Sequence, residues 1–332
     1  MTIPHTRLGN SGLTVSRLAL GTMTFGLQTE ESVSRAILDR AAEAGVDFID
    51  TADAYPIGGD LQTVGRTEEI VGRWLAGRRQ NFIVATKAFN RVGPNRWDLG
   101  LSRKHLFDAI DGSLRRLGTD YVDLYQLHSD DRRTPLDETL EALDHIVRSG
   151  KVRYIGVSNF LAYRLARALG RADLRGLTRF ISVQPRYSLL FREIERELLP
   201  LVQEEGLGVL SYNPLAGGLL TGKHRFESGP PAGTRFTLGT AATRYQERYW
   251  HERQFQTVAE LQRAVAESGL PLATVAVAWV LANPAISCAI IGASKPEQLA
   301  DTLAAAELKL DPELKQKLDD LTAEYRQGDA GR

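Results

Sequence analysis

The sequence predicts an α/β fold, a (β/α)8 TIM barrel with an N-terminal hairpin and long βα loops at the C-terminal face. Eight short apolar runs, rich in β-branched residues, alternate with longer stretches that have helical apolar spacing. The runs are almost continuously apolar, which is typical of parallel strands buried on both faces. Such alternation over eight units favours a closed barrel. The predicted strands span residues 17–21, 46–50, 82–87, 122–127, 153–157, 180–184, 208–212 and 286–291.

The stretches between these strands carry helix signals. Residues 31–44 have apolar side chains at helical spacing, and Gly45 ends the pattern. Ser102 is a favourable N-cap for a helix over residues 102–117. Pro135 is expected at the first position of the next helix, because proline lacks the N–H that a helix leaves unbonded there.

Three regions interrupt the alternation. Residues 8–15 have the pattern of a hairpin that turns at residues 10–12. Residues 56–66 and 223–250 form long loops. Because long βα loops shape the substrate pockets of barrels, we expect loop 223–250 above all to border the active site. The sequence has no internal repeat or linker, so residues 1–332 are predicted to form a single domain.

Composition narrows the function classes. The chain has 332 residues, 43% of them apolar, which is enough for a large core. Its 41 basic and 41 acidic residues balance, so nucleic acid and anionic membranes are not expected partners, although a local basic pocket is compatible with this balance. The longest apolar run, residues 275–282, is shorter than the roughly 18 residues that span a bilayer, and no secretory signal is evident. We therefore expect a cytoplasmic protein.

Polar residues follow seven of the eight predicted strands at their C-terminal ends. In barrels these ends build the active site. Solvent exposure alone does not explain polar residues in phase at seven strands, so we predict one active site at this mouth. In order from the second strand, the residues are Asp50, Lys87, His128, Ser158 with Asn159, Gln184, Tyr212, and Ser294 with Lys295.

Asp50, Tyr55, Lys87 and His128 are the candidate catalytic residues. A carbonyl reductase has to protonate the carbonyl oxygen as hydride reaches the carbon. A free tyrosine, with a pKa of about 10, is a poor acid at neutral pH. The ammonium of Lys87 would lower the pKa of Tyr55, and Asp50 would hold Lys87 in place. His128 would donate a hydrogen bond that orients the carbonyl.

Each of these residues also has a structural interpretation when taken alone. Asp50 could bond the turn after its strand, and Tyr55 could be a loop aromatic residue. Lys87 could be solvated at its strand end, and His128 could cap the turn that follows it. The functional interpretation rests on all four occurring together at one mouth.

Other reactive side chains are expected to have no catalytic role. Cys288 is the only cysteine, which excludes an internal disulfide and a thiolate zinc cluster, and it is expected to be buried. We expect Asp53 to be structural and His105 and His145 to lie on the surface. No metal site is predicted, because His128 has no further ligand at metal spacing.

A set of ordered motifs identifies a family resemblance. The motifs are Leu20-Gly-Thr-Met23, Asp50-Thr-Ala with Tyr55, Ala85-Thr-Lys87, Leu127-His128, Gly156-Val-Ser-Asn159, Gln184, Ser211-Tyr-Asn-Pro-Leu with Gly-Gly-Leu-Leu-Thr-Gly222, and Ile291-Gly-Ala-Ser-Lys295. In this order they resemble the aldo-keto reductase family, over residues 7–325. The chain is more similar to the branch of channel β-subunits and general stress proteins than to the aldose reductase branch. The resemblance implies the catalytic roles given above and hydride transfer from a nicotinamide cofactor bound without a Rossmann domain.

The resemblance implies NADPH or NADP+ as the cofactor, with NADH less favoured. Ser158, Asn159 and Gln184 would hold the carboxamide, and Tyr212 would stack on the nicotinamide ring. The glycine-rich segment after Tyr212 would let backbone N–H groups approach the pyrophosphate. The remaining implied contacts are Gly21, Thr22, Met23, Asp50, Asn213, Pro214, Leu215, Gly217, Leu219, Thr221, Gly222, Lys223, Ile291, Gly292, Ser294, Lys295, Gln298, Asp301 and Thr302.

The preference for NADPH depends on the residues that follow the last predicted strand. Ser294 and Lys295 would bind the adenosine 2′-phosphate, because a hydroxyl and a cation suit a dianion. The chain departs from many relatives here, since Gln298 replaces an arginine and Asp301-Thr302 replaces Glu-Asn. Gln298 has precedent in the channel-associated branch.

The substrate is expected to be a small or medium aldehyde or ketone. Phe25, Phe89, Trp97 and Ser129 are candidate substrate contacts, together with Met23. An apolar, aromatic rim suits such carbonyl compounds. The sequence does not choose among sugars, aromatic aldehydes, ketoesters and polyketide-type ketones, and it leaves the oligomeric state open.

Two other functions are compatible with parts of the pattern. The first is an NADPH-binding regulatory or sensor subunit with slow turnover, as in the channel-associated branch. The second is a Schiff-base enzyme with Lys87 as the nucleophile. The second leaves Ser158, Tyr212 and Lys295 without roles.

Overall fold

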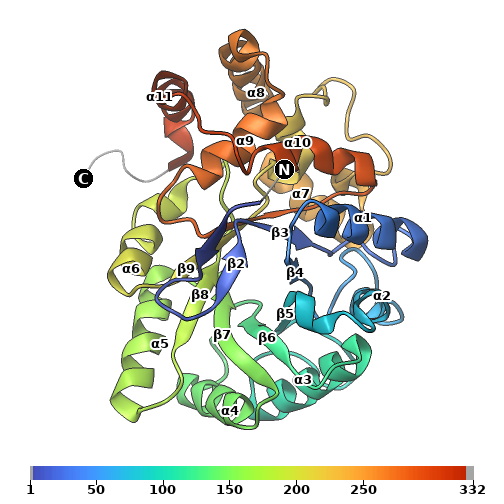
Figure 1. The fold of residues 1–332 in the computed structure, drawn as a ribbon, viewed down its shortest axis with the longest axis vertical. Coiled ribbons are helices and arrows are strands. Elements are labelled where there is room, and N and C mark those ends of the chain that lie inside the picture. The colour runs from blue at the N-terminus through green and yellow to red at the C-terminus, as the bar shows by residue number, and fades with distance from the viewer. Residues whose placement is uncertain (1–2, 327–332) are drawn as a thin grey trace.

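Eight parallel strands form a closed barrel with helices around it (Figure 1). The computed structural model describes residues 3–326. Each strand pairs with the next along the chain, and the last pairs with the first. The (β/α)8 fold predicted from the alternation is confirmed. The barrel strands are β3 (Leu18–Gly21), β4 (Phe48–Asp50), β5 (Ile83–Ala88), β6 (Val122–Leu127), β7 (Val152–Ser158), β8 (Phe180–Gln184), β9 (Gly208–Tyr212) and β10 (Cys288–Ile291).

Strand register brings the polar strand ends to one rim. Gly21 of β3 pairs with Asp50 of β4, and Ser158 of β7 pairs with Gln184 of β8. Lys87 of β5 pairs with Gln126 of β6. Because parallel strands in register end at the same level, these side chains meet at the C-terminal mouth.

The helices follow the sequence signals closely, with shifts of one residue. The Ser102 hydroxyl accepts a hydrogen bond from the N–H of His105 and caps α3 as predicted. Pro135 is the residue before α4 rather than its first residue. The helices are α1 (Glu31–Glu43), α2 (Arg66–Leu75), α3 (Arg103–Leu117), α4 (Leu136–Arg148), α5 (Ala162–Arg175), α6 (Leu198–Glu204), α7 (Ala242–Tyr249), α8 (Glu252–Val265), α9 (Leu272–Leu281), α10 (Leu299–Ala304) and α11 (Pro312–Leu321).

The predicted N-terminal hairpin is present and closes the other end of the barrel. Strands β1 (His5–Arg7) and β2 (Thr14–Ser16) pair antiparallel. Leu8 and Val15 are buried against side chains of the barrel interior. The N–H of Asn10 donates to the carbonyl oxygen of Gly206 at 2.7 Å. The hairpin therefore leaves only the C-terminal mouth open for chemistry.

The core has two parts, one inside the barrel and one between the barrel and its helices. Cys288 is buried, as expected. His145 is exposed, but His105 is buried, and its predicted surface position was wrong. His105 lies four and eight residues before Ala109 and Ser113, so it shares their buried face of α3.

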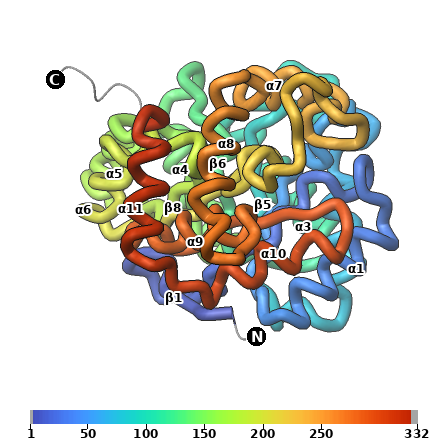
Figure 2. The backbone as a smooth tube through the Cα atoms, turned by 90° about the horizontal axis from the view of Figure 1, so that it is seen from above, coloured from blue at the N-terminus to red at the C-terminus, as the bar shows by residue number. Residues whose placement is uncertain are grey.

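Helices α8 and α11 run side by side on the outside of the molecule (Figure 2). In the described part of the chain, no single helix is long and apolar enough to cross a membrane. One bent pair, Glu252–Ser268 with Leu272–Leu281, satisfies length and composition together across a 93° bend. All of α9 is buried, and such a core helix satisfies the same criterion.

Helices α2 and α3 pack closely at Gly72. A Cβ atom added there would lie 2.4 Å from the carbonyl oxygen of Arg116. The same helix pair is joined by a fully buried carboxylate, Glu68, which accepts hydrogen bonds from Thr86 at 2.5 Å and from Arg116 at 2.7 Å. Strand β5, which carries Thr86 and Lys87, is thus held from outside the barrel.

This packing predicts opposite effects for two glycine-to-alanine substitutions. Gly72→Ala should lower the free energy of unfolding by about 1–3 kcal/mol, because the new methyl group overlaps the α3 backbone. Gly170→Ala in α5 is the matched control, since no heavy atom lies within 4 Å of the added Cβ. That substitution should raise stability by about 0.5–1 kcal/mol. Urea unfolding measures both, and stabilisation by both would contradict the close approach.

Candidate active site

A cavity of about 1380 Å³ lies at the C-terminal mouth of the barrel. Residues at the end of each barrel strand, or directly after it, contribute to its wall. Most of the predicted site residues line this cavity: Gly21, Thr22, Met23, Asp50, Tyr55, Phe89, His128, Ser129, Ser158, Asn159, Gln184, Tyr212, Asn213, Pro214, Leu215, Gly217, Thr221, Lys223, Ile291, Gly292, Ser294, Lys295, Gln298, Asp301 and Thr302.

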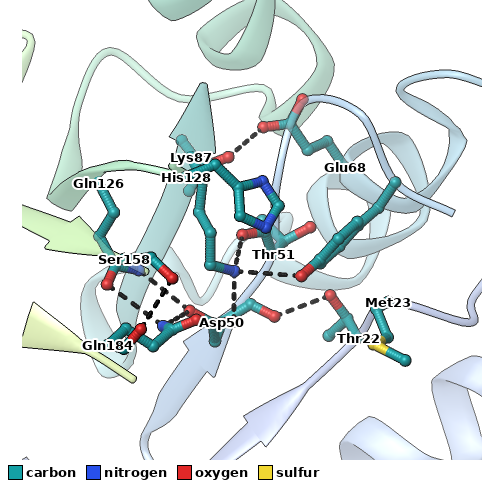
Figure 3. Close-up of polar contacts among 12 residues, drawn as sticks. Thr22, Met23, Asp50, Thr51, Glu68, Lys87, Gln126, His128, Ser158 and Gln184 are labelled. Carbon is teal, nitrogen blue, oxygen red and sulfur yellow. Dashed lines mark hydrogen bonds and ion pairs between the residues drawn. The ribbon is translucent and has the colours of Figure 1, made fainter. Parts of the chain in front are cut away.

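The Lys87 ammonium is the centre of the polar network beneath the cavity (Figure 3). Its side chain is fully buried. It donates to the Asp50 carboxylate at 2.5 Å, to the Thr51 carbonyl oxygen at 2.8 Å and to the Tyr55 hydroxyl at 3.4 Å. An ammonium has three N–H donors, and these acceptors use all of them. Lys87 therefore reaches the cavity through Tyr55.

Two glutamine side chains hold the second oxygen of Asp50. Gln126 and Gln184 donate to Asp50 Oδ2 at 3.1 Å and 2.8 Å. Gln184 was among the predicted site residues, whereas Gln126 was missed. The available signal was its polarity within β6, where most of the other residues are apolar. Asp50 is thus fixed from three strands besides its own, because Lys87 is on β5, Gln126 on β6 and Gln184 on β8.

Burial and charge oppose each other in the Lys87–Tyr55 pair. Burial alone lowers the pKa of Lys87, but Asp50 and Tyr55 together outweigh it and raise that pKa. Burial also raises the pKa of Tyr55, and the opposite effect of Lys87 only partly offsets it. The expected lowering effect of Lys87 on the pKa of Tyr55 is therefore present, but burial outweighs it and the pKa is raised overall. Tyr55 is a protonated hydroxyl, and Lys87 is a buried cation that is poorly suited to act as a Schiff-base nucleophile.

His128 is neutral beside this pair. Burial, followed by the charges of Lys87 and Arg244, holds the pKa of His128 well below its usual value. Its Nδ1 atom lies 3.1 Å from the side-chain amide nitrogen of Asn90. Because an amide N–H donates, Nδ1 accepts, and the ring proton is assigned to Nε2. The Tyr55 and His128 rings meet edge to face with centroids 5.7 Å apart.

A second hydrogen-bond chain joins the ends of β7, β8 and β9. Ser158 donates to the carbonyl oxygen of Gln184 at 2.8 Å, and Asn159 donates to Ser158 Oγ at 3.0 Å. Tyr212 donates to the Asn159 side-chain oxygen at 2.7 Å. Asn159 has a φ of 58°, which is uncommon outside glycine and is seen at functional sites. The structure brings together these four residues as predicted.

The glycine-rich segment after β9 forms an irregular turn at the cavity wall. Gly217 and Gly218 have φ values of 71° and 105°, and Asn213 has 58°. The side-chain amide nitrogen of Asn213 (Nδ2) is buried and has no hydrogen-bond partner among residues 3–326. An unpaired donor beside such a turn suits an anionic or polar ligand.

Two residues predicted in this segment lie away from the cavity. Leu219 packs into the core because the 3-10 turn directs it toward the helices. Gly222 ends this turn in the left-handed region, and a Cβ there would lie 2.2 Å from the Gln262 side chain. The structure therefore does not bring these two predicted contacts to the cavity wall.

Another part of the cavity wall carries Ser294, Lys295 and Gln298. The N–H and hydroxyl of Ser294 both donate to the Gln298 side-chain oxygen, at 2.9 and 3.2 Å. Lys295 is exposed and forms no ion pair within the described residues. This part of the wall can hold an anion if Gln298 releases Ser294.

The two long loops meet beside the cavity. The N–H of Thr240 donates to the Gly58 carbonyl oxygen at 3.3 Å. A Cβ added at Gly239 would lie 2.1 Å from that same oxygen, so the two backbones are in direct contact. Gln28 donates to the Gly233 carbonyl oxygen at 2.6 Å. Loop 223–250 therefore reaches across to the first and second βα connections.

The predicted substrate contacts are only partly brought together. Phe89 and Ser129 line the cavity, but Phe25 is fully buried in the core behind it. Trp97 is 45% exposed and does not reach the cavity. Both positions are corrected, because Phe25 packs in the core between barrel and helices, and the ring of Trp97 lies under the Lys104 side chain.

The expected apolar rim is also incomplete, because four arginines line the cavity. They are Arg91, Arg235, Arg244 and Arg248. No periodic pattern singles them out, since they lie in long connections. Away from the cavity, Asp53 is fully buried, and burial and the nearby Glu68 raise its pKa well above the usual value. No group of three potential metal ligands occurs in residues 3–326.

Comparison with known proteins agrees with this geometry. The aldo/keto reductase family model matches residues 17–323. "Uncharacterized oxidoreductase YrpG" of Bacillus subtilis (strain 168) is 43% identical over 326 residues, which cover 96% of this chain and 95% of that protein. "Protein tas" of Escherichia coli (strain K12) is 38% identical, with 92% and 93% covered. "Probable voltage-gated potassium channel subunit beta" of Oryza sativa subsp. japonica is 37% identical, with 95% of both covered.

These relatives include members named as a channel subunit, as the predicted branch implies. The family model covers nearly the whole barrel, and the relatives match over nearly their full lengths. Most of the motifs that carried the resemblance contribute residues to the cavity wall. This chain is an oxidoreductase of the aldo/keto reductase family.

Proposed function

We propose that this oxidoreductase reduces aldehydes and ketones to alcohols with NADPH. The observation that carries the proposal is the Tyr55 hydroxyl, which opens on the cavity and is backed by the buried Lys87–Asp50 pair. A protonated hydroxyl beside a fixed cation is suited to give up a proton at the moment when negative charge forms on a nearby oxygen.

The proton comes from Tyr55 and the hydride from the cofactor. When bound, the reduced nicotinamide supplies hydride to the carbonyl carbon. Tyr55 gives its hydroxyl proton to the carbonyl oxygen, which completes the alcohol. The phenolate that remains is a charge in a buried place, and the Lys87 ammonium stabilises it electrostatically. Asp50 keeps Lys87 in reach of Tyr55 throughout.

His128 orients the carbonyl. A neutral imidazole with its proton on Nε2 donates one hydrogen bond and adds no charge to the site. Because His128 and Tyr55 both line the cavity, one carbonyl oxygen can accept from both. Asn90 and the edge-to-face contact with Tyr55 keep the ring from turning.

The residues around the cavity fit a nicotinamide dinucleotide. Tyr212, Asn159 and Ser158 offer a flat ring and both donors and acceptors for the nicotinamide carboxamide. The unpaired side-chain amide of Asn213 lies beside the irregular turn and could donate a hydrogen bond to the pyrophosphate. Lys295 and Ser294 supply a cation and a hydroxyl for the 2′-phosphate, which favours NADPH over NADH.

Titration of the purified protein with NADPH and NADH tests the proposal directly. Nucleotide binding would be followed by tryptophan fluorescence, and 4-nitrobenzaldehyde would then be added. We expect tighter binding of NADPH and its oxidation when the aldehyde is present. Failure to bind either nucleotide would contradict the cofactor assignment.

A second function is supported by the relatives named as channel β-subunits. In that case the chain would bind NADPH as a sensor or regulatory subunit and turn it over slowly. The same titration separates the two, because tight binding without oxidation of NADPH by aldehydes favours the sensor.

Tyr55→Phe should reduce kcat for aldehyde reduction by about a hundred-fold or more, because the proton donor is lost. The ring shape is retained, so the dissociation constant for NADPH should stay within about two-fold of the wild-type value. Steady-state kinetics and fluorescence titration measure the two quantities. Unchanged reduction would exclude Tyr55 as the acid.

Lys295→Ala should weaken NADPH binding about ten-fold and leave NADH binding nearly unchanged, because only NADPH carries the phosphate that pairs with the ammonium. The comparison of the two dissociation constants in the same variant is the internal control. An equal loss for both nucleotides would contradict a contact with the 2′-phosphate.

A further inference from the structure

Helix α7 presents two arginines to the cavity. Arg244 and Arg248 are four residues apart, which places them on one face of the helix, and both line the cavity. Tyr245 lies between them and contacts the Met23 sulfur through its hydroxyl, at 4.0 Å. The helix is held against the barrel mouth by the buried side chains of Tyr245 and Tyr249.

Neither arginine is paired with a carboxylate in the described part of the chain. Many other arginines form ion pairs, as Arg116 does with Glu68. The carboxylates in the cavity wall are those of Asp50, Asp60 and Asp301. Asp50 is neutralised by Lys87.

The other two carboxylates do not neutralise α7 either. Asp301 lines the cavity with Lys295 and Gln298, at the end assigned to the adenosine phosphate. Asp60 accepts a hydrogen bond from the N–H of Gln62 within its own loop and forms no ion pair with α7. The α7 arginines thus leave excess positive charge in the cavity.

Both arginines line the same cavity as His128 and Tyr212, and their charges act on these two side chains. The Arg244 charge contributes to the low pKa of His128, and the Arg248 charge opposes the rise in the pKa of Tyr212 that burial causes. His128 and Tyr212 flank the proposed positions of the carbonyl and the nicotinamide. The other two cavity arginines are already engaged. Arg91 donates to carbonyl oxygens of its own loop at 3.2 and 2.8 Å, and Arg235 donates to the Met23 sulfur at 3.5 Å and to the Tyr245 hydroxyl at 3.4 Å.

We infer that Arg244 and Arg248 form a subsite for an anionic group of the substrate, so that the preferred substrates are aldehydes or ketones that carry a carboxylate. The inference rests on the proposed reductase function and narrows its substrate class. A guanidinium donates two parallel hydrogen bonds to a carboxylate, and two of them can enclose it. Burial of that carboxylate next to unpaired cations is favourable, whereas an apolar substrate end would leave them without partners.

The test compares two substrates of the same shape, 4-carboxybenzaldehyde and methyl 4-formylbenzoate. Only the first is an anion at neutral pH. The measured quantity is the ratio of their kcat/KM values with NADPH. We expect Arg244→Gln and Arg248→Gln each to lower this ratio about ten-fold, as loss of one charge-assisted contact implies.

Two further variants control this comparison. Arg244→Lys keeps the positive charge and should retain part of the ratio. Arg263→Gln removes an exposed arginine of α8 that does not line the cavity, and it should leave the ratio unchanged. An unchanged ratio in both glutamine variants of α7 would overturn the inference.

A binding experiment separates this inference from the proposed function. Terephthalate has two carboxylates and no reducible aldehyde, and calorimetry would measure its binding to the protein saturated with NADP+. Weaker binding in Arg244→Gln and Arg248→Gln supports the subsite even if no aldehyde is reduced, in which case the reductase proposal alone fails. Suppose instead that both aldehydes are reduced, and that the ratio of their kcat/KM values and the binding of terephthalate are the same in every variant as in the wild type. That result overturns the subsite and leaves the reductase proposal standing.

Discussion

The burial of one ammonium group, that of Lys87, is the constraint on which the rest of the site depends. An unpaired charge at this depth would cost several kcal/mol. Three acceptors offset that cost, and one of them, the Asp50 carboxylate, is itself held by Gln126 and Gln184. Strands β4, β5, β6 and β8 therefore converge on one charge. The contacts that hold the strand ends together are thus the same ones that would stabilise a tyrosinate in the proposed reaction.

Strand β5 is fixed from both of its faces by consecutive residues. Because side chains alternate along a strand, Lys87 points into the barrel while Thr86 points outward. Thr86 donates to the buried carboxylate of Glu68, which is paired with Arg116 of α3. The position of the ammonium is thus set by the helical layer as well as by the barrel interior. Substitutions in the helical layer, such as at Glu68 or Arg116, would therefore change the position of the Lys87 ammonium through this single strand.

Local patterns predicted the barrel, whereas the parts that depend on distant contacts were not visible in the sequence. The strands over 122–127, 180–184 and 208–212 match from end to end, since their apolar runs have clear limits. Strand β4 starts two residues later than expected, because Asp47 accepts from the N–H of Ser16 in the hairpin. The strand ends also placed most of the candidate site. The role of Gln126, the burial of His105 and the side of α7 that faces the cavity all depend on tertiary packing. The periodicity of the sequence therefore did not predict them.

The contact between the loop backbones at Gly58 and Gly239 has a kinetic consequence. Both loops line the cavity, and they touch through main-chain atoms, with the Leu238 side chain packed beside Gly58. A small carbonyl compound would need only the space beside His128. Exchange of any ligand that crosses the junction would require the two glycine backbones to part, so loop opening would limit the rate of that exchange.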